Sequence, residues 1–140
     1  MAEQLFQIGV KALLRNSSGD ILLEGKRRSD GAVSYDFPGG RVDQGETFTQ
    51  ALARELQEEI GLLHIGNMTH VATTLTKLHP VVNNSPVSLV IVLYEMPYDV
   101  SHVIRLGEDQ DSYKWASPGE ASQLIDFKYT AEFCELIAKL

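Results

Sequence analysis

Apolar residues recur at helical spacing in residues 47–60, which is the most clearly predicted element of the chain. At about 100° per residue these positions fall on one stripe. They are Leu52, Ala53, Leu56 and Ile60. Thr47 and Gln50 have the spacing of a capping box, and Gly61 is a typical helix stop. We therefore predict a helix whose stripe packs on a core.

Alternating apolar and polar residues and β-branched runs predict strands on both sides of this helix. The predicted strands are residues 6–14, 21–23, 69–78, 87–96 and 112–116, with a short extended piece at 35–37. A turn at 16–20 joins the first two strands, so we expect them to form a hairpin. The breaker-rich loop 79–86 predicts a second hairpin, and the apolar centre of strand 87–96 is typical of a central strand.

Two further helices are expected near the C-terminal end of the chain. Ser117 as N-cap and Pro118 at the first helical position begin a short one. Residues 129–140 predict the last, with Cys134 as an inert residue near the core. Its predicted apolar stripe is Phe133, Leu136, Ile137 and Leu140. This order of elements predicts a mixed α/β fold with helices packed on a core sheet, in one domain over residues 1–140.

Three carboxylates gather beside the apolar stripe of the first helix. Glu55, Glu58 and Glu59 lie within an arc of roughly 100°. Like charges at this spacing cost a few tenths of a kcal/mol per pair, and Arg54 offsets only part of that. A bound cation would offset the rest, and ligands that are all oxygen favour Mg²⁺ or Mn²⁺ over zinc. The alternative is a solvated acidic helix face.

The loop before the helix favours the metal interpretation. Phe37-Pro38-Gly39-Gly40 permits a sharp turn and a close approach to a bound group, and Glu46 adds a fourth carboxylate. The whole stretch resembles the Nudix box, G-x5-E-x7-R-E-U-x-E-E-x-G-U, where U is a bulky aliphatic residue. Every fixed position is filled, by Gly40, Glu46, Arg54, Glu55, Leu56, Glu58, Glu59, Gly61 and Leu62.

This resemblance implies a Nudix fold, in which a mixed β-sheet is sandwiched between α-helices (α/β/α). It implies hydrolysis, at the diphosphate, of a nucleoside diphosphate linked to another moiety X. The metal ligands that it implies are Glu55, Glu58, Glu59 and the carbonyl of Gly39. One glutamate would accept the proton of the attacking water. Arg54 would hold the glutamates through ion pairs, and Glu46 would orient its neighbours.

Residues outside the helix are candidates for the remaining contacts. Some MutT-like members supply a further metal-binding glutamate shortly before a tryptophan-bearing strand, and here Glu108 is the first candidate and Asp109 the second. The candidate substrate contacts are Arg27, Arg28, Arg41 and Gly40. The alternative for each charged residue is an ordinary solvated surface.

The substrate is less sharply predicted than the reaction. Trp115-Ala116-Ser117 before a helix is similar to MutT-like nucleotide pyrophosphatases, which are our first expectation. Residues 129–132 lack the asparagine with which such members read a purine, and Pro80 lies roughly where ADP-ribose hydrolases carry a proline. Hydrolysis of ADP-ribose or of a dinucleoside polyphosphate is therefore the alternative. A third hypothesis is a module of the same fold that binds nucleotides without catalysis.

Composition narrows the expected partners. A net charge of −7 on 140 residues argues against binding long nucleic acid and leaves a small nucleotide as the expected ligand. The single cysteine, and the absence of a signal-like apolar segment after the first residues, predict a cytoplasmic protein. The longest apolar run is too short to span a bilayer, so no membrane contact is expected. The sequence leaves a homodimer open.

Overall fold

The computed structural model describes residues 3–140. Strand β1 lies at an inner position of the larger of its two main sheets. The strands are β1 (Phe6–Leu13), β2 (Ile21–Arg27), β3 (Val33–Asp36), β4 (Gly39–Arg41), β5 (Thr69–Leu75), β6 (Val81–Val82), β7 (Ser85–Pro86), β8 (Ser88–Glu95) and β9 (Ser112–Ala116). The helices are α1 (Phe48–Ile60), α2 (Pro118–Leu124) and α3 (Ala131–Ala138).

The larger sheet has the order β4-β1-β8-β5 and is mixed, because β1 and β8 run parallel while the other pairs are antiparallel. A second, antiparallel sheet has the order β3-β2-β9. Strands β6 and β7 form a small hairpin in the loop between β5 and β8. The predicted mixed α/β class is thus confirmed, but the strands form two main sheets where one was expected.

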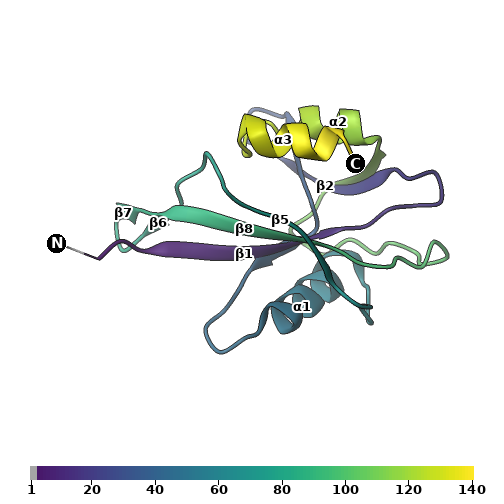
Figure 1. Ribbon diagram of the computed structural model, residues 1–140, viewed down its shortest axis with the longest axis horizontal. Coiled ribbons are helices and arrows are strands. Elements are labelled where there is room, and N and C mark those ends of the chain that lie inside the picture. Colours follow the sequence, from purple (N-terminus) through teal and green to yellow (C-terminus); the bar gives the residue numbers. More distant parts are fainter. Residues whose placement is uncertain (1–2) are drawn as a thin grey trace.

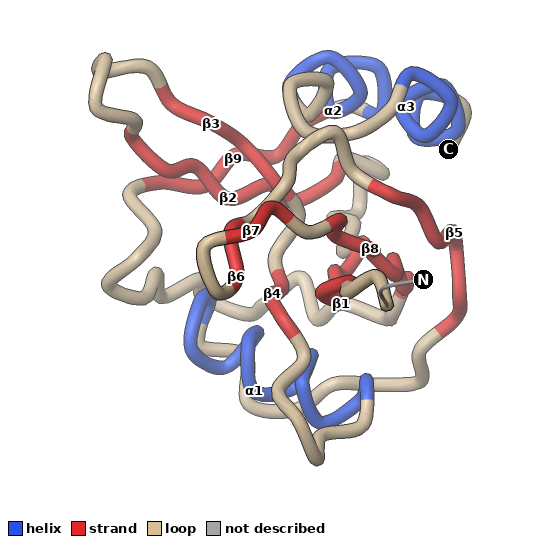
Figure 2. The backbone as a smooth tube through the Cα atoms, turned by 90° about the vertical axis from the view of Figure 1, so that its left-hand side faces the viewer, coloured by secondary structure: helices blue, strands red, loops and turns tan. Residues whose placement is uncertain are grey.

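The helices cover opposite sides of these sheets. Figures 1 and 2 both show α1 on one side and α2 with α3 on the other. Successive residues of β1 supply both cores: Val10 and Ala12 pack in the cluster that holds α1, whereas Leu13 packs in the cluster that holds α3. This alternation follows from the two-residue period of a strand, and it confirms helices on both sides.

Several predicted elements are confirmed. The helix over α1 has its capping box at Thr47 and its left-handed C-cap at Gly61. Strands β5 and β8 form the second predicted hairpin, and β8 is a central strand between β1 and β5. Helix α2 begins with Ser117 as N-cap and Pro118 at its start.

Other predictions are wrong. Strands β1 and β2 are neighbours in sequence but do not form a hairpin, because each enters a different sheet and only an isolated bridge joins Arg15 to Ile21. Helix α3 is shorter than expected, and Leu136 and Leu140 of its predicted stripe are exposed, although the predicted core position of Cys134 is confirmed. In α1, Ala51 and not Ala53 completes the buried stripe. No helix within residues 3–140 is long and apolar enough to cross a membrane.

The packing of α1 predicts a large loss of stability when its stripe is shortened. Leu52 is completely buried, so Leu52→Ala should lower the free energy of unfolding by about 2–5 kcal/mol. Denaturant unfolding followed by circular dichroism measures this change. Leu63→Ala is the matched control, since Leu63 is mostly exposed just beyond the helix. Equal losses in the two variants would contradict the assignment of the stripe.

Candidate active site

Two glycines bring the end of the short strand β4 against helix α1. Gly39 has φ +139°, a conformation that favours glycine, and a Cβ there would overlap the carbonyl of Val10. A Cβ on Gly40 would overlap the carboxyl group of Glu55. The backbone amide of Gly39 donates a hydrogen bond to Oε2 of Glu59 at 2.8 Å. The turn formed by Gly39 and Gly40, here called the glycine turn, is therefore in direct contact with the acidic face of the helix.

Arg54 gathers the carboxylates of the box around one guanidinium group. Its Nε and Nη2 donate to the two oxygens of Glu46 at 2.8 and 2.9 Å, and its Nη1 donates to Glu55 at 2.8 Å. The same Nη1 lies 3.7 Å from Glu58. Nη2 also donates to the backbone carbonyl of Arg41 at 3.1 Å, which ties the helix to the end of β4. Each nitrogen of the Arg54 guanidinium group therefore has a protein acceptor.

Glu46 is held as a carboxylate by these contacts. The hydrogen bonds from Arg54, with a further one from the backbone amide of Asp43, lower the pKa of Glu46 to about 2. The reverse effect of Glu46 raises the pKa of Arg54. Glu46 thus binds Arg54 just before the start of the helix.

Glu59 faces inward, toward charged residues that sequence reasoning missed. Glu24 of β2 is buried, and a hydrogen bond joins its carboxyl group to that of Glu59. Burial first, and the nearby charge of Glu59 second, raise the pKa of Glu24 to about 10. Burial also raises the pKa of Glu59. The hydrogen bond between them raises the pKa of Glu24 and opposes the rise in the pKa of Glu59, so Glu24 is the donor and Glu59 the acceptor.

Lys11 supplies the positive charge on this inner side. Its Nζ donates to the carbonyl of Gly39 at 3.3 Å and lies 3.3 Å from Oδ2 of Asp36. Burial lowers the pKa of Lys11, but the carboxylates of Asp36, Glu59 and Glu24 outweigh it, and the net change is upward. The sequence did not indicate this role of Lys11, because the residue lies in a strand of alternating polarity and its partners come from four other elements.

Asp36 extends this network to the C-terminal segment. Its carboxylate accepts from Nζ of Lys128 at 2.6 Å and from the hydroxyl of Tyr129 at 2.7 Å. The charges of Lys11 and Lys128 and the hydrogen bonds lower the pKa of Asp36, although burial opposes them. Burial, and then repulsion by Lys11, lower the pKa of Lys128. The segment before α3 is thereby anchored to the chain that leads into the glycine turn.

The loop before β9 lies against the same helix. The backbone amide of Gly107 donates to the carbonyl of Glu59 at 3.0 Å, and Nε2 of Gln110 lies 3.5 Å from Oε1 of Glu59. Glu108 and Asp109 lie between these two contacts with exposed side chains. The loop is thus next to the box, and Gln110 is a neighbour of Glu59 that the sequence did not indicate.

The three arginines predicted to contact substrate lie in two separate regions. Arg27 and Arg28 lie at the connection between β2 and β3, where Arg27 donates to the carbonyl of Gly31 at 3.3 Å and Arg28 pairs with Asp30 at 3.6 Å. Arg41 instead ends β4, directly after Gly40, and its side chain is exposed. Only the second place adjoins the glycine turn and the box.

The donors around the turn suit a hard divalent cation, but they do not converge on one point. Within residues 3–140, no group of three His, Cys, Asp or Glu side chains is arranged to hold a metal ion. The reason is visible in their partners: Glu59 is bonded to the Gly39 amide, Glu55 to Arg54, and Glu58 is largely exposed. The carboxylates of Glu55, Glu58 and Glu59 outnumber the nearby cations Arg54 and Lys11, and this excess of oxygen donors fits Mg²⁺ or Mn²⁺.

A hollow of about 180 Å³ opens beside Glu59. Its walls include Lys11, Glu24, Asp36, Glu59, Gln110 and Phe127. Binding sites for whole small molecules are commonly about 300–1,000 Å³, so this hollow has room for only part of a nucleotide.

Comparisons with known proteins show what this chain is similar to. A family model described as NUDIX domain matches residues 5–134. The chain is 32% identical over 113 residues to the mouse bis(5'-nucleosyl)-tetraphosphatase [asymmetrical], covering 81% of this chain and 74% of that protein. It is 45% identical over 64 residues to an 8-oxo-dGTP diphosphatase of Haemophilus influenzae, and this match spans 45% of this chain and 46% of that relative.

Solved structures show the same architecture. The MutT protein from Methanosarcina mazei superposes with a TM-score of 0.74 at 25% identity, covering 99% of this chain and 95% of that one. An Ap4A hydrolase from C. elegans superposes with a TM-score of 0.65 at 21% identity, covering 96% of this chain and 93% of that one. The second likeness is evidence of fold alone.

The Arg54–Glu46 contact predicts a measurable effect of acid on stability. A carboxylate whose folded pKa is lowered, here from 4.5 to about 2, stabilises the fold above its ordinary pKa, and this contribution is lost as the pH falls toward the folded value. Between those two values, wild type should therefore lose more free energy of unfolding than Glu46→Gln, which keeps an oxygen acceptor but cannot titrate.

Denaturant unfolding at a series of pH values measures this difference. Glu135→Gln is the control, because Glu135 is exposed on α3 and has no contact with Arg54. Parallel pH profiles for wild type and Glu46→Gln would contradict the assigned role of the Arg54–Glu46 pair.

Proposed function

The chain belongs to the NUDIX domain family, and on this premise we propose that it is a divalent-metal-dependent hydrolase of a small nucleotide that contains a diphosphate linkage. The observation that carries the proposal is the contact of the glycine turn with Glu55 and Glu59, two of the three helix carboxylates, with all nine fixed residues of the box present. A module without catalysis would not need this complete set of carboxylates, so we favour an enzyme.

We propose that Glu55, Glu58, Glu59 and the Gly39 carbonyl hold the metal, with Mg²⁺ as the ion and Mn²⁺ as a substitute. When bound, the cation neutralises the charge of the phosphates, which otherwise repels an incoming nucleophile. For this the Gly39 carbonyl must be shared with, or released by, Lys11, and Asp36 is placed to receive the lysine. Glu59 keeps the turn in place through its bond to the Gly39 amide.

The reaction needs one proton acceptor. Water attacks one phosphorus, a new P–O bond forms, and the bridging P–O bond of the diphosphate breaks. A glutamate of the box takes the proton of the water, and the departing phosphate takes up a proton from solvent or from that glutamate. Glu58 is the candidate with the freest side chain, since it is 60% exposed and 3.7 Å from Arg54. Arg54 and Glu46 position the helix carboxylates without touching the reacting atoms.

Two classes of substrate follow from the relatives. The Haemophilus influenzae relative is named for 8-oxo-dGTP, and a nucleoside triphosphate is the substrate expected of a MutT-like pyrophosphatase. The mouse relative, which matches over a larger share of both chains, is named for a bis(5'-nucleosyl)-tetraphosphate. Because this match covers more of both chains, dinucleoside polyphosphates are the second candidate class, ahead of ADP-ribose. Chromatographic separation of the nucleotide products formed from both classes, in the presence and absence of Mg²⁺, tests the proposed function.

We further propose that the protein acts in the cytoplasm as a single catalytic domain. Its one cysteine, Cys134, is buried and unpaired, and a reduced thiol of this kind suits a reducing compartment. No long nucleic acid is expected as a partner, because the net charge is −7. A homodimer remains open, and sedimentation or light scattering would decide it.

The helix carboxylates should be essential for turnover. Glu58→Gln and Glu59→Gln should each lower kcat by a factor on the order of 10² or more, because each removes a metal ligand or the proton acceptor. Initial rates at saturating Mg²⁺ and substrate measure the effect, and unfolding curves check that the fold is kept. Glu135→Gln is the matched exposed control. Near-normal turnover in both site variants would rule this assignment out.

The loop before β9 should contribute to metal binding. Glu108→Gln should raise the Mg²⁺ concentration for half-maximal rate on the order of tenfold and lower kcat, since the exposed carboxylate lies between two contacts to Glu59. A Mg²⁺ titration of the initial rate measures this. Asp109→Asn and the double variant separate the two carboxylates. Wild-type metal dependence in all three variants would make this loop a solvated surface only.

A further inference from the structure

Lys11 reaches the glycine turn from β1, where it lies opposite Gly39 in the strand pairing. Its side chain passes over Gly39: a Cβ there would lie 3.0 Å from Cδ of the lysine, so glycine leaves room for the lysine stem. Nζ then lies 3.3 Å from the Gly39 carbonyl and 3.3 Å from Oδ2 of Asp36. Hydrogen bonds from a cationic nitrogen to a carboxylate are commonly about 2.7–2.9 Å long. Lys11 is therefore shared between two acceptors and held closely by neither.

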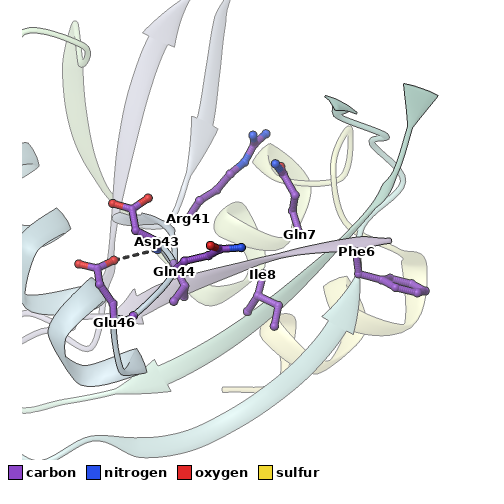
Figure 3. A pocket seen from close by; sticks show the side chains of 9 residues that line it. Phe6, Gln7, Ile8, Arg41, Asp43, Gln44 and Glu46 are labelled. Atoms are coloured by element: carbon purple, nitrogen blue, oxygen red, sulfur yellow. Dashed lines mark hydrogen bonds between the residues drawn. The ribbon is translucent and has the colours of Figure 1, made fainter. Parts of the chain in front are cut away.

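The cation on the outer side of the turn is held more firmly. Arg54 donates to the two oxygens of Glu46 at 2.8 and 2.9 Å, and the backbone amide of Asp43 adds a further bond to Glu46 at 2.8 Å. Figure 3 shows Glu46 and Asp43 together on the wall of a larger hollow of about 640 Å³, which Phe6 also lines. A divalent ion would have to break several short bonds to displace Arg54, whereas Lys11 loses only one long bond when it leaves the turn.

Asp36 is a fixed acceptor for a displaced lysine. Nζ of Lys128 and the hydroxyl of Tyr129 donate to its two oxygens at 2.6 and 2.7 Å, and the backbone amide of Phe37 donates at 2.8 Å. These bonds fix the carboxylate while Oδ2 stays within reach of Lys11. Both Lys11 and Asp36 line the hollow of about 180 Å³, which gives the ammonium group room to move. The segment before α3 thus determines where the lysine can go.

We propose that Lys11 is a built-in competitor of the metal ion: its ammonium group binds the Gly39 carbonyl until a divalent ion takes that place, and then moves to Asp36. This role rests on the proposed function, in which the carbonyl binds the metal. Lys11 holds the turn together before the ion arrives, and by competing for the carbonyl it lowers the affinity for the ion. Asp36 acts in the opposite direction, because it draws the lysine away from the carbonyl.

Binding of Mn²⁺ in the absence of substrate tests this role, since electron paramagnetic resonance follows the free ion directly. Lys11→Met keeps the length of the side chain but removes the ammonium group. It should tighten Mn²⁺ binding about tenfold, which is the order of a hydrogen bond from a charged donor. Loss of a merely structural residue would weaken binding instead. Lys26→Met is the matched control, because Lys26 lines the same hollow with an exposed side chain, and it should leave the affinity nearly unchanged.

A double-variant cycle shows whether Asp36 acts through the lysine. Asp36→Asn alone should weaken Mn²⁺ binding about tenfold, because the lysine then stays on the carbonyl. In the Lys11→Met background the same substitution should have little effect, since the two residues are coupled. Equal weakening in both backgrounds would show that Asp36 acts as a distant charge and would overturn the proposal.

A crystal structure of the wild type with Mg²⁺ needs no variant, so it decides the matter even if Lys11→Met does not fold. Nζ of Lys11 should then bind Asp36 and no longer the Gly39 carbonyl. A lysine that still donates to the carbonyl beside bound Mg²⁺ would overturn the proposal, as would unchanged or weaker Mn²⁺ binding in Lys11→Met.

Hydrolysis is measured separately from binding. If the wild type hydrolyses no nucleotide, the proposed function fails, and the Mn²⁺ affinities still decide the role of Lys11. If neither the wild type nor Lys11→Met binds Mn²⁺, both proposals fail.

Discussion

The close contact between the glycine turn and the acidic face of α1 is the constraint on which the site depends. Gly40 leaves space that the Glu55 carboxyl fills, and Gly39 adopts a backbone conformation that brings its amide to Glu59. A larger residue at position 40 would collide with Glu55 of the helix, and one at position 39 would collide with the backbone of β1 at Val10. The capping box at Thr47 and the stop at Gly61 then determine which residues of the helix meet the turn.

Charge is distributed so that each carboxylate has a different environment. Arg54 neutralises Glu46 and Glu55 at the outer side of the turn, whereas Lys11 faces Glu59 and Asp36 at the inner side. Burial raises the pKa of Glu24 beside Glu59. Similar side chains thus differ in charge and freedom, which is what the division of roles that we propose among the glutamates requires.

The topology explains how distant segments reach one turn. Strand β1 pairs with β4 on one edge and β8 on the other, and this brings Lys11 opposite Gly39. The chain from β3 carries Asp36, which binds the segment before α3, and the loop before β9 binds the end of α1. The short length of β4 also leaves the edge of β1 uncovered, so the same feature that builds the turn creates the hollow beside Phe6.

The sequence by itself determined the local elements and the chemistry of the box. Patterns within a few residues of one another predict the apolar stripe of α1, its caps and strand β8, because caps and periodicity depend on residues a few positions apart. The same short stretch contains the oxygen donors of the box. Tertiary structure decided what pairs across the chain. Strands β1 and β2 separate into two sheets, since strand pairing depends on the whole core and not on the turn between them. Lys11, Glu24 and Asp36 join the site only because four elements meet there, and no local pattern marks a buried charge whose partners lie far away in sequence.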